Sequence, residues 1–447
     1  MSIVSAVWIE GISPPETMPA SADVVIIGGG IVGVSTAWFL AQDGVEVVLC
    51  EKGHIAGEQS SRNWGWIRKQ GRDVREMPLM IESQRIWRSF EADTGEDVGY
   101  AEGGCYYLAA NQEQLEAYDS WVHTARGFGL DTRIVQGSEL KDHLAGTSQT
   151  WPGALYTASD GRAEPHMATH AFARVASRSG ATLLTGCAVR GLETQAGKVS
   201  AVVTEHGTIK ASAVLCAAGA WSSMFCRSLG ISLPQLKVKG TVARTARGPR
   251  ILDGQCVDDR VAIRRRQDGG YTVAHGLGSL LHPITPSTFR FAYLFLPALK
   301  QEAGAMRLTI NGDFFRELAT PIRWPLDRES PFEKQRVLDP APDQRTLGKI
   351  RKNLNDVFPA LENADIVETW AGMVETTPDV VPVIGAEESL PGFFIATGLS
   401  GHGFGTGPGV GKVSACMLTG KDSGIDISPF RLSRFFDGSP IELGPAL

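Results

Sequence analysis

The sequence has no paired-cysteine motif, no long apolar run and no strong excess of charge. Its seven cysteines are scattered, odd in number and never spaced C-x-x-C, which argues against a disulfide framework or a zinc site and fits reduced thiols. A net charge of −6 over 447 residues does not favour nucleic acid or an anionic membrane as a partner. The nine histidines form no ligand set, so no metal is expected.

Targeting signals are also missing from the sequence. Residues 1–22 contain no basic residue and no long apolar run, and prolines interrupt them, so neither a signal peptide nor a membrane helix is expected there. No apolar run of membrane-spanning length follows later, and we expect a soluble, cytoplasmic protein without a membrane segment. Apolar residues make up 43% and charged residues 21% of the chain, as in ordinary globular proteins. The length predicts two domains, because single cores stop growing near about 250–300 residues.

What the sequence does contain is a complete nucleotide-binding fingerprint near its start. An apolar run at 23–27 leads into a G-x-G-x-x-G turn formed by Gly28, Gly30 and Gly33. A helical pattern follows, and a second apolar run at 45–50 ends in Glu51, 18 residues after Gly33. Gly28 allows the tight turn, Gly30 lets the backbone approach a diphosphate, and Gly33 lets helix and strand pack closely.

The fingerprint indicates how a dinucleotide would be held. The helix N-terminus contributes free N–H groups and the positive end of its dipole to the phosphates. Glu51, at the tip of the second strand, can accept hydrogen bonds from both ribose hydroxyls. A lone glycine-rich turn also occurs in other α/β proteins, but here strand, helix, second strand and acid are all in register, which favours dinucleotide binding.

Three further segments suggest that the dinucleotide carries a flavin. A polar loop at 53–63 suits the ribityl chain and diphosphate, and Trp64 to Trp66 could line the ring or be ordinary core residues. A strand at 213–217 ends in small residues that permit close approach of a ligand. A second glycine-rich loop at 397–407 precedes a helix expected from Val410. Its backbone N–H groups at 400–405 can stabilise negative charge on a reduced ring, and we expect His402 to be structural rather than a base.

The order of these segments predicts a mixed α/β and α+β protein in which one domain interrupts another. We expect a discontinuous, Rossmann-like FAD-binding domain at 1–75, 150–228 and 369–447. A second, mixed-sheet substrate-binding domain would comprise 76–149 and 229–368. Helices are predicted over 76–98, 112–128 and 344–357, and strands over 289–296 and 306–311.

Four segments occur in an order that carries a family resemblance. They are the fingerprint with Glu51-Lys52, then Gln59-Ser60-Ser61-Arg62, Ala217-Ala218-Gly219 and Gly401-His402-Gly403. Together they resemble the FAD-dependent amine and amino-acid oxidoreductases of the D-amino-acid oxidase and glycine oxidase superfamily, over nearly the whole chain. The stretches 55–62, 190–197 and 329–334 are most similar to bacterial L-amino-acid deaminases and L-amino-acid oxidases.

Two features depart from the deaminases. Their N-terminal membrane helix is absent, and Trp66 stands where they carry glutamine after the S-S-R-x-x-G run. The run 63–66, Asn-Trp-Gly-Trp, looks more like that of opine oxidase and D-amino-acid dehydrogenase relatives. Side-chain preference and enantiomer therefore stay open.

The resemblance implies FAD as cofactor and an amino acid as substrate. We expect molecular oxygen as electron acceptor, because no membrane segment ties the protein to a quinone pool. The substrate, preferably a free L-amino acid, would give up a hydride to flavin N5 and become an imino acid, which hydrolyses to a 2-oxo acid and ammonia. Oxygen would become hydrogen peroxide. The alternatives are an opine or D-amino-acid dehydrogenase that passes electrons to another acceptor, and a non-catalytic FAD-binding protein. Assembly as a homodimer is a further expectation.

The resemblance also assigns residues. Arg264, seven residues before Tyr271, would grip the substrate carboxylate, as the guanidinium fork can; the alternative is a triplet of solvated arginines. Trp370 would cap the substrate side chain, or pack in the core. Trp66 and Tyr271 complete the expected catalytic set. The expected cofactor contacts are Gly28, Gly30, Ile31, Val32, Gly33, Glu51, Lys52, Gln59, Ser60, Ser61, Arg62, Asn63, Gly65, Trp66, Val189, Ala217, Ala218, Gly219, Trp221, Gly372, Gly401, His402, Gly403 and Phe404.

Overall fold

The predicted strand–turn–helix–strand unit is present in the computed structural model, which describes residues 17–276, 280–301 and 306–444. β1 (Val24–Ile27) leads into α1 (Ile31–Gln42), and β2 (Val47–Cys50) pairs with β1 in parallel. Both strands are buried along their whole length, because parallel strands are covered on both faces, which explains why they read as continuous apolar runs.

A six-stranded sheet is built around this unit. Its order is β21–β22–β13–β1–β2–β9, and its pairs are parallel except for β21 against β22. The other strands are β9 (Thr182–Leu184), β13 (Ala213–Cys216), β21 (Val383–Ala386) and β22 (Phe393–Thr397). This is the predicted Rossmann-like arrangement, assembled from distant parts of the chain.

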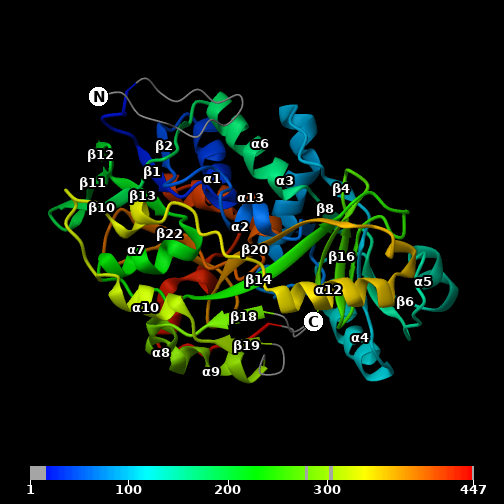
Figure 1. Cartoon of the computed structure of the whole chain (residues 1–447). Helices are drawn as coiled ribbons and strands as arrows, with labels where there is room; N and C mark the ends of the chain where they lie inside the picture. The colour runs from blue at the N-terminus through cyan, green and yellow to red at the C-terminus, as the bar shows by residue number, and fades with distance from the viewer. Residues whose placement is uncertain (1–16, 277–279, 302–305, 445–447) are drawn as a thin grey trace.

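A larger mixed sheet fills the other side of the molecule (Figure 1). Its order is β19–β18–β14–β17–β16–β15–β5–β7–β6, with β20 paired to β14. Its strands are β5 (Cys105–Leu108), β6 (Thr132–Val135), β7 (Ala154–Thr157), β14 (Leu236–Thr245), β15 (Gln255–Val257), β16 (Val261–Arg265), β17 (Tyr271–His275), β18 (Leu280–Pro283), β19 (Met306–Thr309) and β20 (Ile366–Thr376). The smaller sheets contain β10 (Val189–Gln195), β11 (Lys198–Thr204) and β12 (Gly207–Lys210), and β3 (Trp66–Ile67), β8 (Gly161–Arg162) and β4 (Ala101–Glu102).

The predicted helices are confirmed within a few residues at their ends. They are α3 (Met77–Thr94), α4 (Gln112–Gly127) and α12 (Gln344–Val357). The remaining helices are α2 (Gln59–Arg62), α5 (Gly137–His143), α6 (Pro165–Arg178), α7 (Ser222–Ser228), α8 (Pro286–Arg290), α9 (Ala292–Gln301), α10 (Gly312–Ala319), α11 (Pro331–Lys334) and α13 (Gly403–Thr419). Short 3₁₀ turns span Gly219–Trp221, Pro359–Leu361, Ser428–Phe430 and Leu432–Phe435.

The strand predicted over 289–296 is wrong, because α8 and α9 occupy this segment. Thr285 and Thr288 form a capping box and Pro286 stands in the first turn of α8, all signals that start a helix. Phe291, Leu294, Phe295 and Ala298 are buried at helical spacing, and the apparent alternation came from exposed aromatic residues between them. The strand predicted at 306–311 is confirmed in part as β19.

Two segments bear on the predicted division into domains. β7 pairs with β5 and β6 in the larger sheet, although it falls in a segment assigned to the cofactor domain. α3 packs against α13, although it falls in a segment assigned to the substrate domain. All strands of the six-stranded sheet come from the segments assigned to the cofactor domain. The exact boundaries stay a prediction.

The late helix begins seven residues earlier than we expected, at Gly403 rather than Val410. A Cβ on Gly407 would lie 2.7 Å from the Ile31 side chain, and one on Gly411 would lie 2.5 Å from the Cβ of Ser35. The glycines that suggested a loop are instead the face by which α13 packs closely on α1. Close packing of helices thus overrides the low helix propensity of glycine.

Some chemical features can be stated for the described part of the chain. All seven cysteines lie in it as free thiols, and every one except Cys416 is buried. Within 17–276, 280–301 and 306–444, no helix is long and apolar enough to cross a bilayer. Over the same ranges, no group of three His, Cys, Asp or Glu side chains could hold a metal ion.

A pair of helical glycines tests the packing of α13. Gly411→Ala should lower the thermal midpoint, because overpacking a close helix contact costs about 1–3 kcal/mol. Gly348→Ala, on the exposed face of α12 with nothing within 4 Å of the added Cβ, should leave the midpoint unchanged or raise it, since alanine is the better helix former by up to about 1 kcal/mol. Thermal unfolding followed by circular dichroism measures both. Equal shifts would contradict the packing role.

Candidate functional site

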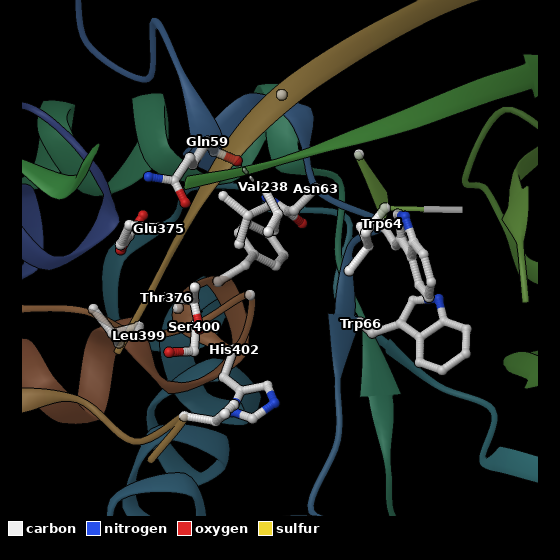
Figure 2. A pocket seen from close by; sticks show the side chains of 18 of the residues that line it. Gln59, Asn63, Trp64, Trp66, Val238, Glu375, Thr376, Leu399, Ser400 and His402 are labelled. Atoms are coloured by element: carbon white, nitrogen blue, oxygen red, sulfur yellow. Dashed lines mark hydrogen bonds between the residues drawn. The ribbon is translucent and has the colours of Figure 1, made fainter. Parts of the chain in front are cut away.

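The main cavity lies where the start of α1, the loop at 59–66, β14, β20 and the late glycine loop meet. Its volume is about 600 Å³, within the range of cofactor and ligand pockets. Figure 2 shows Gln59 and Glu375 on one side, His402 and Ser400 below, and Trp64 and Trp66 across the cavity from them. A second cavity of about 100 Å³ shares Gly30, Gln59 and Ser60 with the first and extends to Glu51.

The phosphate turn has the geometry that its glycines predict. Gly28 has φ +112°, and a Cβ there would lie 2.5 Å from the carbonyl oxygen of Ala217. A Cβ on Gly33 would lie 2.0 Å from the Gly28 carbonyl oxygen. The Ile31 amide donates to Ser60 Oγ at 2.9 Å, which places the polar loop directly over the first turn of α1. The N-terminus of α1 and the ends of β1 and β13 therefore border the two adjoining cavities.

Glu51 is fixed at the edge of the second cavity. Its Oε2 accepts from the Gly29 amide at 2.7 Å, and its Oε1 accepts from the Gly53 amide at 2.7 Å. Burial raises the pKa of Glu51, and the two backbone amides act against this rise. Each carboxylate oxygen keeps a further acceptor position, so the side chain can still accept from a pair of ribose hydroxyls.

Lys52 is engaged by the protein itself. Its Nζ donates to Glu58 Oε1 at 2.9 Å and to the Arg336 carbonyl at 2.6 Å, and it lies 4.1 Å above the Trp221 ring. Trp221 Nε1 donates to Glu58 Oε1 at 2.9 Å. These side chains line the second cavity, but their polar atoms bond mainly to other groups of the protein.

The loop at 59–66 is tied to the neighbouring strands. Asn63 Nδ2 donates to the Ser60 carbonyl at 2.9 Å, and the Gly65 amide donates to Asn63 Oδ1 at 2.8 Å. Arg62 Nη1 donates to the Ala371 carbonyl at 3.1 Å, and Trp370 Nε1 donates to the Arg62 carbonyl at 2.8 Å. Trp370 does not line the main cavity, so the cap predicted for the substrate side chain is not formed by Trp370. It fastens the loop to β20 instead.

The late loop also borders the main cavity. Gly401, His402, Gly403 and Phe404 all line it. His402 Nδ1 lies 3.0 Å from Glu76 Oε2, and burial lowers the pKa of His402, assisted by the charge of Arg72. A neutral imidazole held by a buried carboxylate fits the predicted structural role. The N-terminus of α13 contributes its free amides next to it.

Glu375 is a cavity residue that the sequence did not suggest. It is 4% exposed and its Oε2 has no hydrogen-bond partner, and it lines the main cavity together with Gln59 and Leu399. An unpaired buried acceptor between the phosphate turn and the late loop suits the hydroxyl groups of a ribityl chain. The donor and acceptor pattern of the cavity therefore fits FAD.

Arg264 does not occupy the position that the resemblance assigned to it. Its side chain is fully buried and outside the cavity wall. Nη1 and Nη2 donate to Glu164 Oε1 and Oε2 at 2.8 and 3.1 Å, and Nη2 also donates to Thr272 Oγ1 at 3.0 Å. The guanidinium packs on Gly65, between the tryptophans of the cavity wall. Because a carboxylate already fills its fork, Arg264 holds the loop rather than a substrate.

Tyr271 is likewise buried and away from the cavity wall. Its hydroxyl donates to the Pro249 carbonyl at 2.7 Å and accepts from Arg265 Nη1 at 2.7 Å and the Ile251 amide at 2.9 Å. With all its hydrogen-bonding capacity used in the larger sheet, Tyr271 cannot serve a substrate. Trp66, in contrast, lines the cavity, with its ring centroid 5.4 Å from that of Trp64.

Arginines of the cavity wall were missed by the sequence analysis. Arg68 and Arg72 line the main cavity beside His402, and they follow the tryptophan run in the basic segment 68–72. In the sequence this segment is a cluster of positive charge next to the tryptophans expected at the flavin ring. Nothing in the sequence distinguishes it from a solvated loop.

Most predicted cofactor contacts come together around the two cavities. Those that line the main cavity, the second cavity or both are Gly28, Gly30, Ile31, Val32, Glu51, Lys52, Gln59, Ser60, Arg62, Asn63, Trp66, Val189, Ala217, Ala218, Gly219, Trp221, Gly372, Gly401, His402, Gly403 and Phe404. Gly33, Ser61 and Gly65 lie behind the wall and support it. These assignments to the cofactor stay predictions.

Comparison with known proteins identifies the family. Residues 23–417 match the model of the DAO family, described as FAD dependent oxidoreductase. The chain belongs to this family. Its cofactor is therefore FAD, as predicted from the fingerprint and the flavin-facing loops.

The structure of L-amino acid deaminase from Proteus myxofaciens in complex with anthranilate is similar at 34% sequence identity, with a TM-score of 0.91 and 95% of this chain and 96% of that chain covered. Glycine oxidase from Geobacillus kaustophilus is 26% identical over 92% of this chain and 97% of its own length. Mouse mitochondrial sarcosine dehydrogenase is 25% identical, but the match spans only 42% of its length. The predicted resemblance to the amino-acid oxidoreductases of this family, close to the bacterial deaminases, is confirmed.

The ion pair of Arg264 gives a test that separates support from substrate binding. Arg264→Met should destabilise the protein by about 3–5 kcal/mol, because it breaks the buried pair and leaves Glu164 with only the Gln267 amide at 2.8 Å and Arg266 at 3.7 Å. Adding Glu164→Gln should recover most of that loss. Thermal unfolding measures both variants, with Arg250→Met, on an exposed pair with Asp253, as the control. An Arg264→Met protein with unchanged stability would contradict the structural role.

Glu375 predicts a pH-dependent stability of the FAD-free protein. Burial raises its pKa from 4.5 to about 7, so between these values the folded chain holds a proton that the unfolded chain has released. Stability therefore falls as pH rises through this window. Glu375→Gln should raise the thermal midpoint at pH 8, where the cost removed is on the order of 3 kcal/mol, and should leave it nearly unchanged at pH 4.5. The same offset at both pH values would contradict the shift.

Proposed function

We propose that this protein oxidises a free L-amino acid to its imino acid, which water converts to a 2-oxo acid and ammonia. The observation that carries the proposal is the 34% identity to the Proteus deaminase over nearly the full length of both chains. A single cavity that runs from the phosphate turn to Trp64 and Trp66 supports it. When bound, FAD supplies a ring that accepts a hydride.

Different residues of this chain would bind different parts of the cofactor. The first turn of α1 would receive the diphosphate, and Glu51 would accept from the ribose hydroxyls. Glu375 would accept from the ribityl chain. The free amides at the start of α13 would stabilise negative charge at the ring end. Trp64 and Trp66 would exclude water from the place where the substrate Cα–H lies.

Oxygen as electron acceptor, with release of hydrogen peroxide, is the version that we favour. The likeness to a glycine oxidase across nearly all of both chains supports it. The seven free cysteine thiols suit a reducing compartment, and we therefore propose a cytoplasmic location.

The test is anaerobic mixing of the holoenzyme with individual L- and D-amino acids, followed by admission of air. We expect L-amino acids to bleach the flavin absorbance, and air to restore it with stoichiometric hydrogen peroxide. Flavin that stays oxidised under every amino acid would contradict the proposal and select a non-catalytic FAD-binding protein. The matched enantiomer serves as the control in each case.

A second candidate is a dehydrogenase that passes electrons to another acceptor, such as an opine or D-amino-acid dehydrogenase. The likeness to sarcosine dehydrogenase and the Asn63 to Trp66 run favour it. In the same experiment it predicts bleaching by a D-amino acid or an opine, rapid reduction of an artificial dye, and little peroxide after air is admitted.

A further inference from the structure

Because Arg264 does not line the main cavity, another group must hold the carboxylate of the proposed substrate. The described residues of the main cavity wall include three arginines, Arg62, Arg68 and Arg72. Arg62 is occupied, because its Nη1 and Nη2 donate to the Ala371 and Gly57 carbonyls at 3.1 and 3.2 Å and it pairs with Asp339. Arg68 and Arg72 are differently placed, and we call them the arginine pair.

Arg72 has donors that the protein does not use. It is 2% exposed, yet its Nε and Nη1 have no hydrogen-bond partner. Its Nη2 donates to the Arg68 carbonyl at 3.1 Å. The nearest carboxylate oxygen, Glu76 Oε2, is 3.8 Å from Nη1, beyond hydrogen-bond distance. Buried N–H groups of a charged side chain are costly to leave unpaired, so this geometry calls for an acceptor from outside the chain.

The charges around the arginine pair do not balance. Among the described carboxylates paired with Arg72, Glu76 lies 3.8 Å from its Nη1, and Glu76 Oε2 also lies 3.0 Å from His402 Nδ1. Asp73 pairs with Arg75 at 2.7 Å and Asp160 lies 3.6 Å from Lys69, so both are engaged elsewhere.

Arg68 brings the second, uncompensated charge. It donates through Nη1 to the Gln70 carbonyl and lies 5.6 Å over the Tyr107 ring, and no ion pair of Arg68 occurs among the described residues. With His402 neutral, the group carries two guanidinium charges against one carboxylate. Arg68, Arg72, Glu76 and His402 together therefore carry an excess of about one positive charge, which matches a single carboxylate.

The position suits a substrate rather than the cofactor. The arginine pair follows Trp66 in the chain, lies near His402 of the late loop, and does not line the second cavity, which contains Gly28 and Glu51. Trp64, Trp66 and Tyr107 line the adjacent wall and offer apolar surface to a side chain. A ligand here would have its anionic group on the arginines and its apolar part against the aromatic rings.

We propose that Arg68 and Arg72 bind the α-carboxylate of an amino acid whose side chain is apolar. The inference rests on the proposed function, because it assumes that the substrate is an amino acid. A carboxylate at the arginine pair accepts the unused donors of Arg72 and neutralises the charge of Arg68. In this arrangement the charge-assisted hydrogen bonds fix the orientation of the substrate, and Arg264 supports the wall from behind.

The test measures binding of an unreactive carboxylate, so it does not require turnover. Holoenzyme is titrated with anthranilate and with the neutral anthranilamide, and the change in the flavin spectrum gives both dissociation constants. We expect anthranilate to bind at least about 10- to 100-fold more tightly, as for hydrogen bonds to a charged group. In Arg68→Met and in Arg72→Met the ratio should fall to near one, while bound FAD per chain stays the same.

The controls keep the result decisive. Arg68→Lys should recover part of the ratio, because it keeps the charge but loses the fork. Arg85→Met, on the exposed face of α3 and paired with Glu82, should leave the ratio as in the wild type. Arg68 is half-buried, so Arg68→Met should perturb folding less than Arg72→Met. If the Arg72→Met protein does not fold, the Arg68→Met protein still gives the test. Absence of anthranilate binding, or a ratio that survives Arg68→Met, would overturn the inference.

The two experiments distinguish a failure of this inference from a failure of the proposed function. If no amino acid reduces the flavin but anthranilate discrimination depends on Arg68, the carboxylate site stands and the reaction is wrong. If amino acids reduce the flavin but discrimination is unaffected by Arg68→Met, the reaction stands and the carboxylate site is wrong.

Discussion

The close contact between α1 and α13 is the interaction on which the site depends. Ile31 meets Gly407 and Ser35 meets Gly411, so the two helices run side by side in the same direction (Figure 1). Their N-termini therefore point into one cavity, which residues 30–32 and 401–403 line. The absence of side chains on the glycines sets the separation of the two positive helix ends. In the function that we propose, both helix N-termini direct backbone amides at one cofactor, the first at its diphosphate and the second at its ring.

The antiparallel pair of β14 and β20 supplies the wall between these helix ends. Its register runs from Leu236 opposite Thr376 to Thr245 opposite Ile366, and the strands pass from the region of the six-stranded sheet into the larger sheet (Figure 1). Gly240 and Gly372 pair directly and both line the cavity. Arg264 belongs to the same sheet through β16, and its guanidinium supports the adjoining loop at Gly65 without lining the cavity.

Sequence reasoning succeeded where the signal is local and failed where partners are distant. The fingerprint from Gly28 to Glu51 is contained in two strands and one helix, so residue types and spacing were enough to predict its geometry. Arg264 meets Glu164, 100 positions away in the chain, and nothing in the arginine triplet indicates which of its members is paired. The strand predicted over 289–296 failed because helix start signals at 285–288 competed with an alternating pattern. Arg72 was missed for the opposite reason, since its importance lies in the partners it lacks.

The two anionic groups that the cavity would receive are served in different ways. At the phosphate turn, Lys52 is bound to Glu58 and Arg336 is paired with Glu205 at 2.6 Å, so both nearby cations are already neutralised. A diphosphate there depends on helix amides, whose donors are fixed in direction and cannot follow a different ligand. At the arginine pair, by contrast, Arg72 is buried with unused donors. The pair with Glu76 and His402 carries a net positive charge. In the function that we propose, these separate modes of anion recognition would keep a small carboxylate from competing with the cofactor, since the helix amides and the arginine pair satisfy different geometries.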